Sequence, residues 1–258
     1  MFRPILSWFG LILLAISFVC FLLVTPPLQP VAKSRPIARG NEAAPVIVLD
    51  PGHGGQDSGA MCGAVLEKDL TLDVARRAEM LLRAAGYTTR LTRDSDRYLS
   101  LAQRAEVANH EKNSLFVSIH FNDGERAAAS GVETYFAARQ NATSPGIFGW
   151  FSFLQPRESK PLFAQSESLA RFLQAALVER TQALNRGIKS ERFYVIAQVR
   201  HPSALVEGGF ITNPADVAKL TTTGYRQQIA SAICDGICRY REASLPNEPT
   251  LAWAAPAE

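Results

Sequence analysis

Cysteine, histidine and surplus charge are all scarce in this sequence. Its 258 residues include four cysteines and four histidines, and 27 basic residues stand against 24 acidic ones, for a formal net charge of +3. Four cysteines in a chain of this length do not make a disulfide framework. A charge this close to balance gives no reason to propose nucleic acid as a partner. The sequence also shows no internal repeat.

One long apolar run is present, near the N-terminus. Residues 5–24 contain no charged side chain, Arg3 precedes them, and Pro26 and Pro27 follow. Such a run is typical of an export signal, and at about 1.5 Å per residue it also has the length to span a bilayer core of about 30 Å. We predict a signal peptide or a signal anchor over residues 1–25. No small-x-small cleavage site follows, which favours the anchor, and both forms place the rest of the chain outside the cytoplasm.

The rest of the chain has the length of a single domain. Residues 26–44 indicate a linker, because they contain several prolines and basic residues but no apolar period. The domain is expected over 45–242, with an insert at 137–165, and a flexible tail at 243–258. Strand patterns alternate with helical ones, which indicates an α/β fold with a mostly parallel twisted sheet and helices on both faces. Strands are expected at 46–50, 87–92, 115–119, 131–136 and 204–206, and helices at about 68–85, from 100, at 166–184, from 214 and at 225–241.

Two of these helices begin with clear capping signals. Ser100 and Gln103 have the spacing of a capping box, in which each side chain bonds the backbone N–H of the other residue. Asn213 and Pro214 supply a capping side chain and a proline at the first helical position.

Four short segments carry the residues with the most distinctive chemistry. Three of them are apolar strands that end in an ionisable residue, namely His53, His120 and Glu207, and in the fourth Glu67 comes just before a helix expected to start near Lys68. Open α/β sheets hold their ligands at the carboxyl ends of their strands, so we expect these four side chains at one rim. The segments are VIVLDPGHGGQDSG (46–59), LEKDLTLDVA (66–75), LFVSIHFND (115–123) and ALVEGGFITN (204–213).

Taken alone, the histidines and Glu67 have ordinary structural explanations, but Glu207 does not, because a carboxylate beside an apolar run is costly to bury without a partner or a metal. A histidine after a strand is often a hydrogen-bonded turn residue, and Glu67 suits the positive end of a helix dipole. Together, two imidazoles and one carboxylate are the ligand set of a catalytic zinc site whose fourth position stays open for water. We therefore predict one Zn²⁺ per chain bound by His53, Glu67 and His120, with Glu207 as a carboxylate that need not bind the metal.

Two polar residues lie close in sequence to these ligands. Asp57 follows His53 by four positions and Asn122 follows His120 by two. Side chains that bond to metal ligands orient them, and these two have the right character for that role. The alternative is that both are plain surface turn residues.

These segments resemble the zinc-dependent N-acetylmuramoyl-L-alanine amidases of the bacterial cell wall, whose catalytic domain opens with a strand and a Gly-His-Gly-Gly turn. The resemblance covers roughly residues 45–240 and is carried by DPGHGGQDSG, EKDLTLDVA, TTRLTRDSD, SLAQRAEVAN, FVSIHFND, GVETYF and FYVIAQVRHPSALVEGGFITNPADVAKL. It implies the metal ligands His53, Glu67 and His120 and the catalytic base Glu207. It also implies hydrolysis, in the cell envelope, of the amide that joins N-acetylmuramic acid to L-alanine of the peptidoglycan stem peptide.

The chain departs from the family pattern in two places. Phe121 and Asp123 replace the small residues usual after the second histidine, which predicts bulk and charge at the rim. Cys62, between the first two ligands, is either an apolar filler or a soft ligand that competes for metal. Two other functions use the same features: another zinc hydrolase of the envelope, such as a peptidase or deacetylase, or a non-catalytic wall-binding regulator on the same fold.

The insert at 137–165 admits three interpretations. Its centre, 146–154, is more apolar than a solvated loop needs to be, so the segment either packs on the core or forms a lip that contacts glycan or membrane. The third interpretation follows from relatives in which an inserted helix blocks the zinc site until an activator protein removes it. Glu158 or Glu167 would then be the self-inhibitory ligand.

Overall fold

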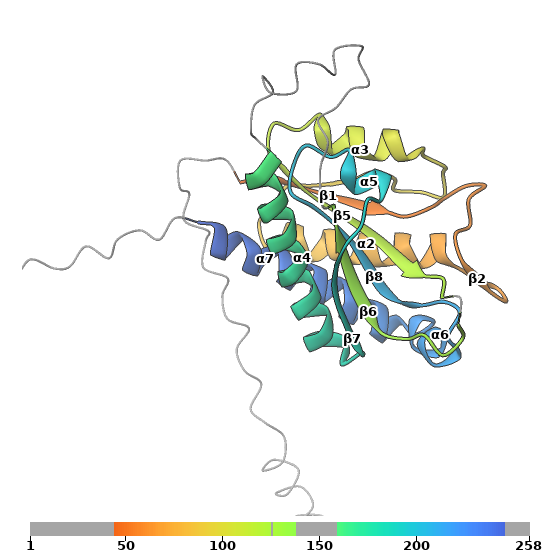
Figure 1. Ribbon diagram of the computed structural model, residues 1–258. Coiled ribbons are helices and arrows are strands. Elements are labelled where there is room, and N and C mark those ends of the chain that lie inside the picture. The colour runs from red at the N-terminus through yellow and green to blue at the C-terminus, as the bar shows by residue number, and fades with distance from the viewer. Residues whose placement is uncertain (1–43, 125, 138–158, 246–258) are drawn as a thin grey trace, which may run out of the picture. The chain divides into compact units, whose positions relative to one another are not determined.

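The computed structural model describes residues 44–124, 126–137 and 159–245, and these form one α/β unit (Figure 1). The predicted signal segment, nearly all of the linker, the apolar centre of the insert, Glu158 and most of the tail lie outside the described residues. Within the described ranges, no helix combines the length and the apolar character needed to cross a membrane.

Six strands form a mixed sheet in the order β4-β1-β5-β8-β6-β7. Neighbouring strands are parallel throughout, except that β6 and β8 run antiparallel. The predicted mostly parallel sheet is thus confirmed. The strands are β1 (Val46–Pro51), β4 (Thr89–Leu91), β5 (Ser114–Asn122), β6 (Val132–Phe136), β7 (Asn185–Ser190) and β8 (Ser203–Phe210), and a small separate hairpin consists of β2 (Met61–Cys62) and β3 (Val65–Leu66).

Helices cover both faces of this sheet, as predicted. Alternate strand residues face opposite sides, so that Ile47 and Leu49 join one apolar cluster while Val48 joins the other. Figure 1 shows α3 and α5 together on one side of the sheet and α2, α4 and α7 on the other. The helices are α2 (Glu67–Ala84), α3 (Leu101–Asn109), α4 (Ser159–Thr181), α5 (Tyr194–Ala197), α6 (Pro214–Leu220) and α7 (Thr223–Ser244).

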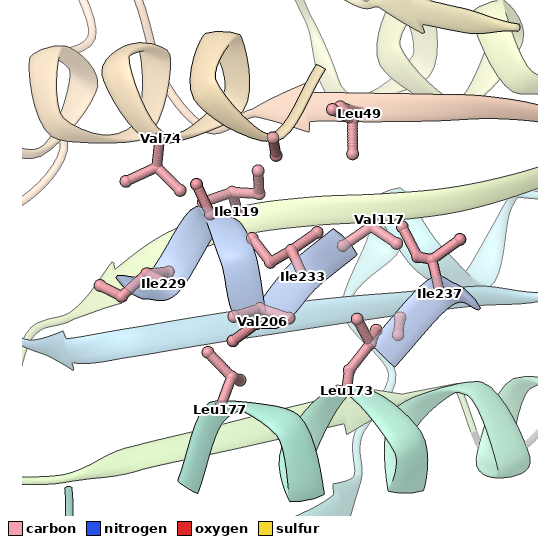
Figure 2. Close-up of a cluster of buried hydrophobic side chains, with 14 of the residues drawn as sticks. Leu49, Val74, Val117, Ile119, Leu173, Leu177, Val206, Ile229, Ile233 and Ile237 are labelled. Carbon is pink, nitrogen blue, oxygen red and sulfur yellow. The ribbon is translucent and has the colours of Figure 1, made fainter. Parts of the chain in front are cut away.

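The larger apolar cluster lies between the sheet and helices α2, α4 and α7. Ile229, Ile233 and Ile237 recur at every fourth position of α7 and are fully buried. Figure 2 shows these side chains between the strand residues Val117 and Val206 and the neighbouring helices. Because the helices bury one face of the sheet completely, functional side chains are left to the strand ends.

Both predicted capping signals are confirmed. Ser100 and Gln103 bond each other's backbone N–H groups at the start of α3. The Asn213 side chain accepts hydrogen bonds from the N–H groups of Ala215 and Asp216, with Pro214 as the first residue of α6.

Several predicted boundaries are wrong. Helix α2 begins at Glu67, next to the predicted start near Lys68, whereas α4 begins at Ser159 rather than near Ser166. The last part of the expected 137–165 insert is therefore the first two turns of α4, and Ala137 at its other end is buried. Strand β7 was not predicted, because its sequence NRGIKS is too polar for a buried strand, and it lies at an edge of the sheet.

Helices α4 and α7 pack closely against each other at Gly236. A Cβ atom at this position would lie 2.8 Å from the Leu173 Cα atom, so the two backbones would have to move apart. We expect Gly236→Ala to lower the free energy of unfolding by about 1–3 kcal/mol, the usual cost of overpacking. Urea denaturation of the purified protein measures this change.

Gly224→Ala is the matched control in the same helix. Nothing lies within 4 Å of the Cβ position at Gly224, so this variant gains helix propensity without a clash and should be neutral or up to about 1 kcal/mol more stable. Equal destabilisation of both variants would show that the α4–α7 contact is not the cause.

Candidate metal centre

The turn after β1 presents the first histidine of the site. His53 adopts a left-handed backbone conformation with φ of 59°, which is uncommon for any residue other than glycine. Gly54 and Asp57 exchange two backbone hydrogen bonds, of 2.8 and 3.2 Å, and so close the turn directly after it. The Asp57 carboxylate accepts a hydrogen bond from His53 Nδ1 at 2.9 Å. This bond leaves Nε2 as the ring nitrogen that is available to a metal.

Two buried arginines hold the backbone of this turn from below. Arg104 donates to the carbonyl oxygens of Pro51 and His53, both at 2.6 Å. Arg93 donates to the carbonyl oxygen of Gly52 at 2.8 Å. Three consecutive peptide carbonyls, those of residues 51–53, are thus held by guanidinium groups.

Arg104 is itself held by an ion pair within the protein interior. Its Nη1 atom lies 2.9 Å from Oδ1 of Asp50, which is fully buried. The Asp50 carboxylate also accepts hydrogen bonds from Thr92 and Ser118, at 2.6 and 2.7 Å. These positioning residues were not among the predicted site residues, although both arginines lie in segments that resemble the amidase family.

Glu67 occupies the first position of α2 and joins the two histidines. Its Oε1 atom lies 2.9 Å from His120 Nδ1, and its Oε2 atom lies 3.1 Å from His53 Nε2. The N–H groups of Phe121 and Ala60 donate to the same two oxygens, at 3.0 and 2.9 Å. Burial alone would raise the pKa of Glu67, but the hydrogen bonds from His120 and His53 outweigh it and hold the pKa far below its usual range. The carboxylate is therefore ionised.

His53, Glu67 and His120 form the one group of potential metal ligands found among the described residues. Their ligand atoms all lie within 4.8 Å of one another, and the two imidazole rings meet edge to face with centroids 4.8 Å apart. Two imidazoles and one carboxylate suit Zn²⁺ and leave a fourth position for water or substrate. The three predicted ligands are thus brought together from β1, α2 and β5.

Glu207 lies beside this group on the neighbouring strand. It is the register partner of His120 across the β5–β8 pair, and its residue is 9% exposed. Its Oε2 atom has no hydrogen-bond partner in the part of the chain that the structure describes. Burial raises the pKa of the Glu207 carboxyl well above its usual value, and the nearby Glu67 and Glu133 carboxylates raise it further.

The orphaned oxygen of Glu207 is the observation that tests the fit of a metal. Buried polar atoms in proteins are nearly always bonded, to protein, water or an ion. A cation beside Glu207 would favour its charged form and oppose the raised pKa. The residues present therefore fit a bound Zn²⁺.

The remaining predicted site residues lie elsewhere. Asn122 does not contact a ligand but donates to Glu133 Oε1 at 2.6 Å. Glu167 lies on α4, where it pairs with Arg171 at 2.5 Å, and it is not in the ligand group. Cys62 is exposed in β2 and is also outside that group.

The expectation that Phe121 adds bulk to the rim is wrong. Its side chain is 1% exposed and belongs to the larger apolar cluster. Strand β5 continues past His120 to Asn122, so the alternation of the strand turns Phe121 toward the core. Asp123 is exposed, as expected.

A second buried carboxylate, Glu133, was missed by the sequence analysis. It is 1% exposed and is the register partner of Glu207 across the antiparallel β6–β8 pair. His120, Glu207 and Glu133 therefore form one row across three adjacent strands. The signal in the sequence was a glutamate inside the otherwise apolar strand GVETYF.

Comparison with known proteins supports a single family. The family model described as N-acetylmuramoyl-L-alanine amidase matches residues 47–239. The N-acetylmuramoyl-L-alanine amidase LytC of Bacillus subtilis is 37% identical over 194 residues, which are 75% of this chain and 35% of LytC. The chain thus spans about a third of the length of that relative.

Solved structures of amidases share the fold. The catalytic domain of CwlV, an N-acetylmuramoyl-L-alanine amidase from Bacillus (Paenibacillus) polymyxa var. colistinus, matches with a TM-score of 0.65 and 30% identity over 77% of this chain and 99% of that one. The CwlD amidase from Clostridioides difficile, in complex with the GerS lipoprotein, matches with a TM-score of 0.65 and 27% identity over 78% of this chain and 100% of that one.

The buried Asp50–Arg104 pair gives a prediction about stability. Arg104→Met would leave the Asp50 carboxylate buried without its cationic partner, and loss of one partner of a buried pair costs about 3–5 kcal/mol. We expect the free energy of unfolding to fall by that amount, as measured by urea denaturation.

Arg90→Met is the control. Arg90 pairs with Glu111 at 2.8 Å, close to the 2.9 Å of the Arg104 pair, but its side chain is 58% exposed. Exposed pairs contribute about 1 kcal/mol or less, so this variant should unfold almost like the wild type. A small effect of Arg104→Met would contradict the role given to the buried pair.

Proposed function

This chain belongs to the N-acetylmuramoyl-L-alanine amidase family, and from that membership we propose that it hydrolyses peptidoglycan at the amide between N-acetylmuramic acid and L-alanine of the stem peptide. The observation that carries the proposal is the group of His53, Glu67 and His120 with the buried Glu207 beside it. A non-catalytic regulator on this fold has no need of both a ligand set and an adjacent carboxylate.

The three ligands would hold one zinc ion. Bound in this way, zinc lowers the pKa of a water to about 7 and polarises the carbonyl of the amide. The protein supplies the orientation of the ligands. Asp57 fixes the tautomer of His53, and the Arg104 and Arg93 guanidinium groups fix the backbone from which His53 projects.

Glu207 would be the general base. Its free Oε2 atom is able to accept a proton from the attacking water and then to donate it to the α-amine of the leaving alanine. Burial raises the pKa of this carboxyl, and a zinc ion beside it would lower the pKa again and so favour the ionised form that accepts the proton. Strand β8 keeps this group rigid between the metal ligand His120 and the buried Glu133.

The cellular setting is part of the same proposal. The apolar residues 5–24 would export the chain and keep it at the outer face of the inner membrane or release it into the periplasm, where peptidoglycan is present. An activator acting on the 137–165 insert stays a prediction. It is supported by analogy with CwlD, whose solved structure is a complex with the GerS lipoprotein.

The general base gives the direct test. We expect Glu207→Gln to release no stem peptide from isolated peptidoglycan, since the amide keeps the shape of the side chain but does not accept the proton. Zinc content should stay at one ion per chain, because Glu207 is outside the ligand group. Mass spectrometry of the soluble products and atomic absorption of the full-length protein in detergent make the two measurements.

Glu106→Gln is the matched control, because Glu106 is an exposed glutamate on α3 and should tolerate the change. Products that begin with alanine identify the amidase reaction, whereas products cut within the peptide or deacetylated sugars identify another zinc hydrolase. Loss of zinc from Glu207→Gln would make Glu207 a ligand and contradict its role as base.

Gly59 gives a test of metal binding that does not depend on activity. It has a φ of +65°, and a Cβ atom there would lie 2.5 Å from Glu67 Oε2 and 2.6 Å from His53 Cδ2. We expect Gly59→Ala to displace two ligands and to weaken zinc binding at least tenfold, as altered support of metal ligands commonly does, roughly 10–100-fold. Competition with a chromophoric chelator measures the zinc affinity.

Gly63→Ala carries the same backbone strain without the contact. Gly63 has a φ of +59°, and nothing lies within 4 Å of its Cβ position. This variant should bind zinc like the wild type. Equal zinc affinity of the Gly59 and Gly63 variants would count against the proposed ligand set.

A further inference from the structure

Two basic side chains from the edge strand β7 converge on the buried Glu133. Arg186 Nε and Lys189 Nζ both donate to Glu133 Oε2, at 2.7 and 2.6 Å. Its other oxygen, Oε1, accepts from Asn122 and from the hydroxyl of Tyr135, each at 2.6 Å. We call Arg186 and Lys189 the basic pair. Glu133 anchors it from beneath.

The basic pair carries more charge than its anchor neutralises. The Glu133 carboxylate bonds both cations, whose side chains are 31% and 37% exposed, and the Glu207 carboxyl also interacts electrostatically with Lys189. Among the described residues, no protein acceptor bonds the two Nη atoms of Arg186, and the Lys189 ammonium group donates one hydrogen bond, which leaves two of its three N–H groups available. These donors are free to bind a ligand from solution.

Aromatic rings hold both cations in place. The Arg186 guanidinium lies 4.8 Å from the centroid of the Phe210 ring, and Lys189 Nζ lies 5.5 Å from that of Tyr135. Cation–π contacts and the shared carboxylate restrict the rotamers of both side chains. Their binding geometry is therefore fixed before any ligand arrives, which lowers the entropic cost of binding.

The basic pair lies at a short, defined distance from the reacting centre. His120, Glu207 and Glu133 are register partners on β5, β8 and β6. Adjacent strands are about 4.8 Å apart, so Glu133 and the metal ligand are separated by roughly 10 Å. An extended peptide covers this distance in about three residues. The basic pair is thus within reach of the first residues beyond the scissile bond.

In the substrate of the proposed reaction, the charged groups lie on the stem peptide and not on the glycan. The lactyl carboxyl of N-acetylmuramic acid is consumed in the scissile amide, and the acetamido sugars are neutral. Carboxylates remain on the stem peptide, which contains acidic residues. A guanidinium and an ammonium side by side therefore match the peptide side of the substrate rather than the glycan.

We propose that Arg186 and Lys189 form a carboxylate-binding subsite, which recognises an acidic group on the stem-peptide residue that follows L-alanine. This inference rests on the proposed amidase function and adds a determinant of substrate specificity to it. Glu133 acts as a positioning residue, since it contacts the basic pair and not the substrate.

Two synthetic probes that differ in one group test the subsite. They are N-acetylmuramoyl-L-alanyl-D-glutamine, whose only peptide carboxylate is the α-carboxylate, and its α-carboxamide, which has none. Full-length protein in detergent is assayed for cleavage of each probe. Each probe is also added as a competitor during peptidoglycan digestion, so that its binding is measured even if it is not cleaved. We expect KM, or the inhibition constant, to be about tenfold lower for the carboxylate, as for one charge-assisted hydrogen bond.

Substitutions of the basic pair should remove this preference selectively. In each of the single variants Lys189→Met and Arg186→Gln, KM should rise for the carboxylate probe alone, and kcat should stay nearly unchanged. Lys189→Arg should keep the preference, because it keeps the charge. Arg239→Gln is the matched control. Arg239 is a half-exposed arginine on α7 that forms an ion pair with Glu179 on α4, outside the proposed subsite.

Three results would overturn the subsite. They are a wild type that treats both probes alike, a variant with both Lys189→Met and Arg186→Gln that keeps the preference, and an equal fall in kcat for both probes, which would place the basic pair among the catalytic residues. If the wild type releases no alanine peptide from peptidoglycan, the proposed function itself fails. If it does release one without a carboxylate preference, only the subsite fails.

Discussion

The carboxylate of Glu67 is the group on which the rest of the site depends. It contacts both imidazoles and accepts two backbone hydrogen bonds, and so joins the turn after β1, the start of α2 and the end of β5. A buried carboxylate is unfavourable without partners, and these four contacts supply them. The same contacts bring two histidines that are far apart in sequence to the distance a metal requires.

Charged groups buried beneath the rim give the site its rigidity. Asp50 and Arg104 fix the peptide carbonyls below His53, and Glu133 fixes the basic side chains of β7. Buried ion pairs contribute little net stability compared with apolar packing, so their presence is better explained by what they position. Asp50 lies near the carboxyl end of β1, whereas Glu133 and Arg186 lie near the amino ends of β6 and β7, because these two strands run antiparallel to β8.

The errors of prediction have physical causes in particular residues. Helix α4 starts well before Ser166 although Pro161 lies in this stretch, because a proline in the first turn of a helix has no intrahelical hydrogen bond to lose. Strand β7 is polar because it is an edge strand, and two of its side chains serve Glu133 instead of the core. Apolar periodicity predicts a helix or strand only where apolar residues face the core. The start of α4 and the polar strand β7 lack that pattern and were therefore not predicted.

The sequence by itself determined the sheet class, the helix caps Ser100 and Asn213, and the choice of His53, Glu67, His120 and Glu207 as candidate site residues. Each of these follows from residue type and local spacing, which are present in the chain before it folds. Only the tertiary structure decided which charges meet. Asp50 and Arg104 are 54 positions apart, and Glu133 is 53 and 56 positions from its two cations. The row of His120, Glu207 and Glu133 depends on a strand order, β5-β8-β6, that differs from the order along the chain, and no local pattern records that order.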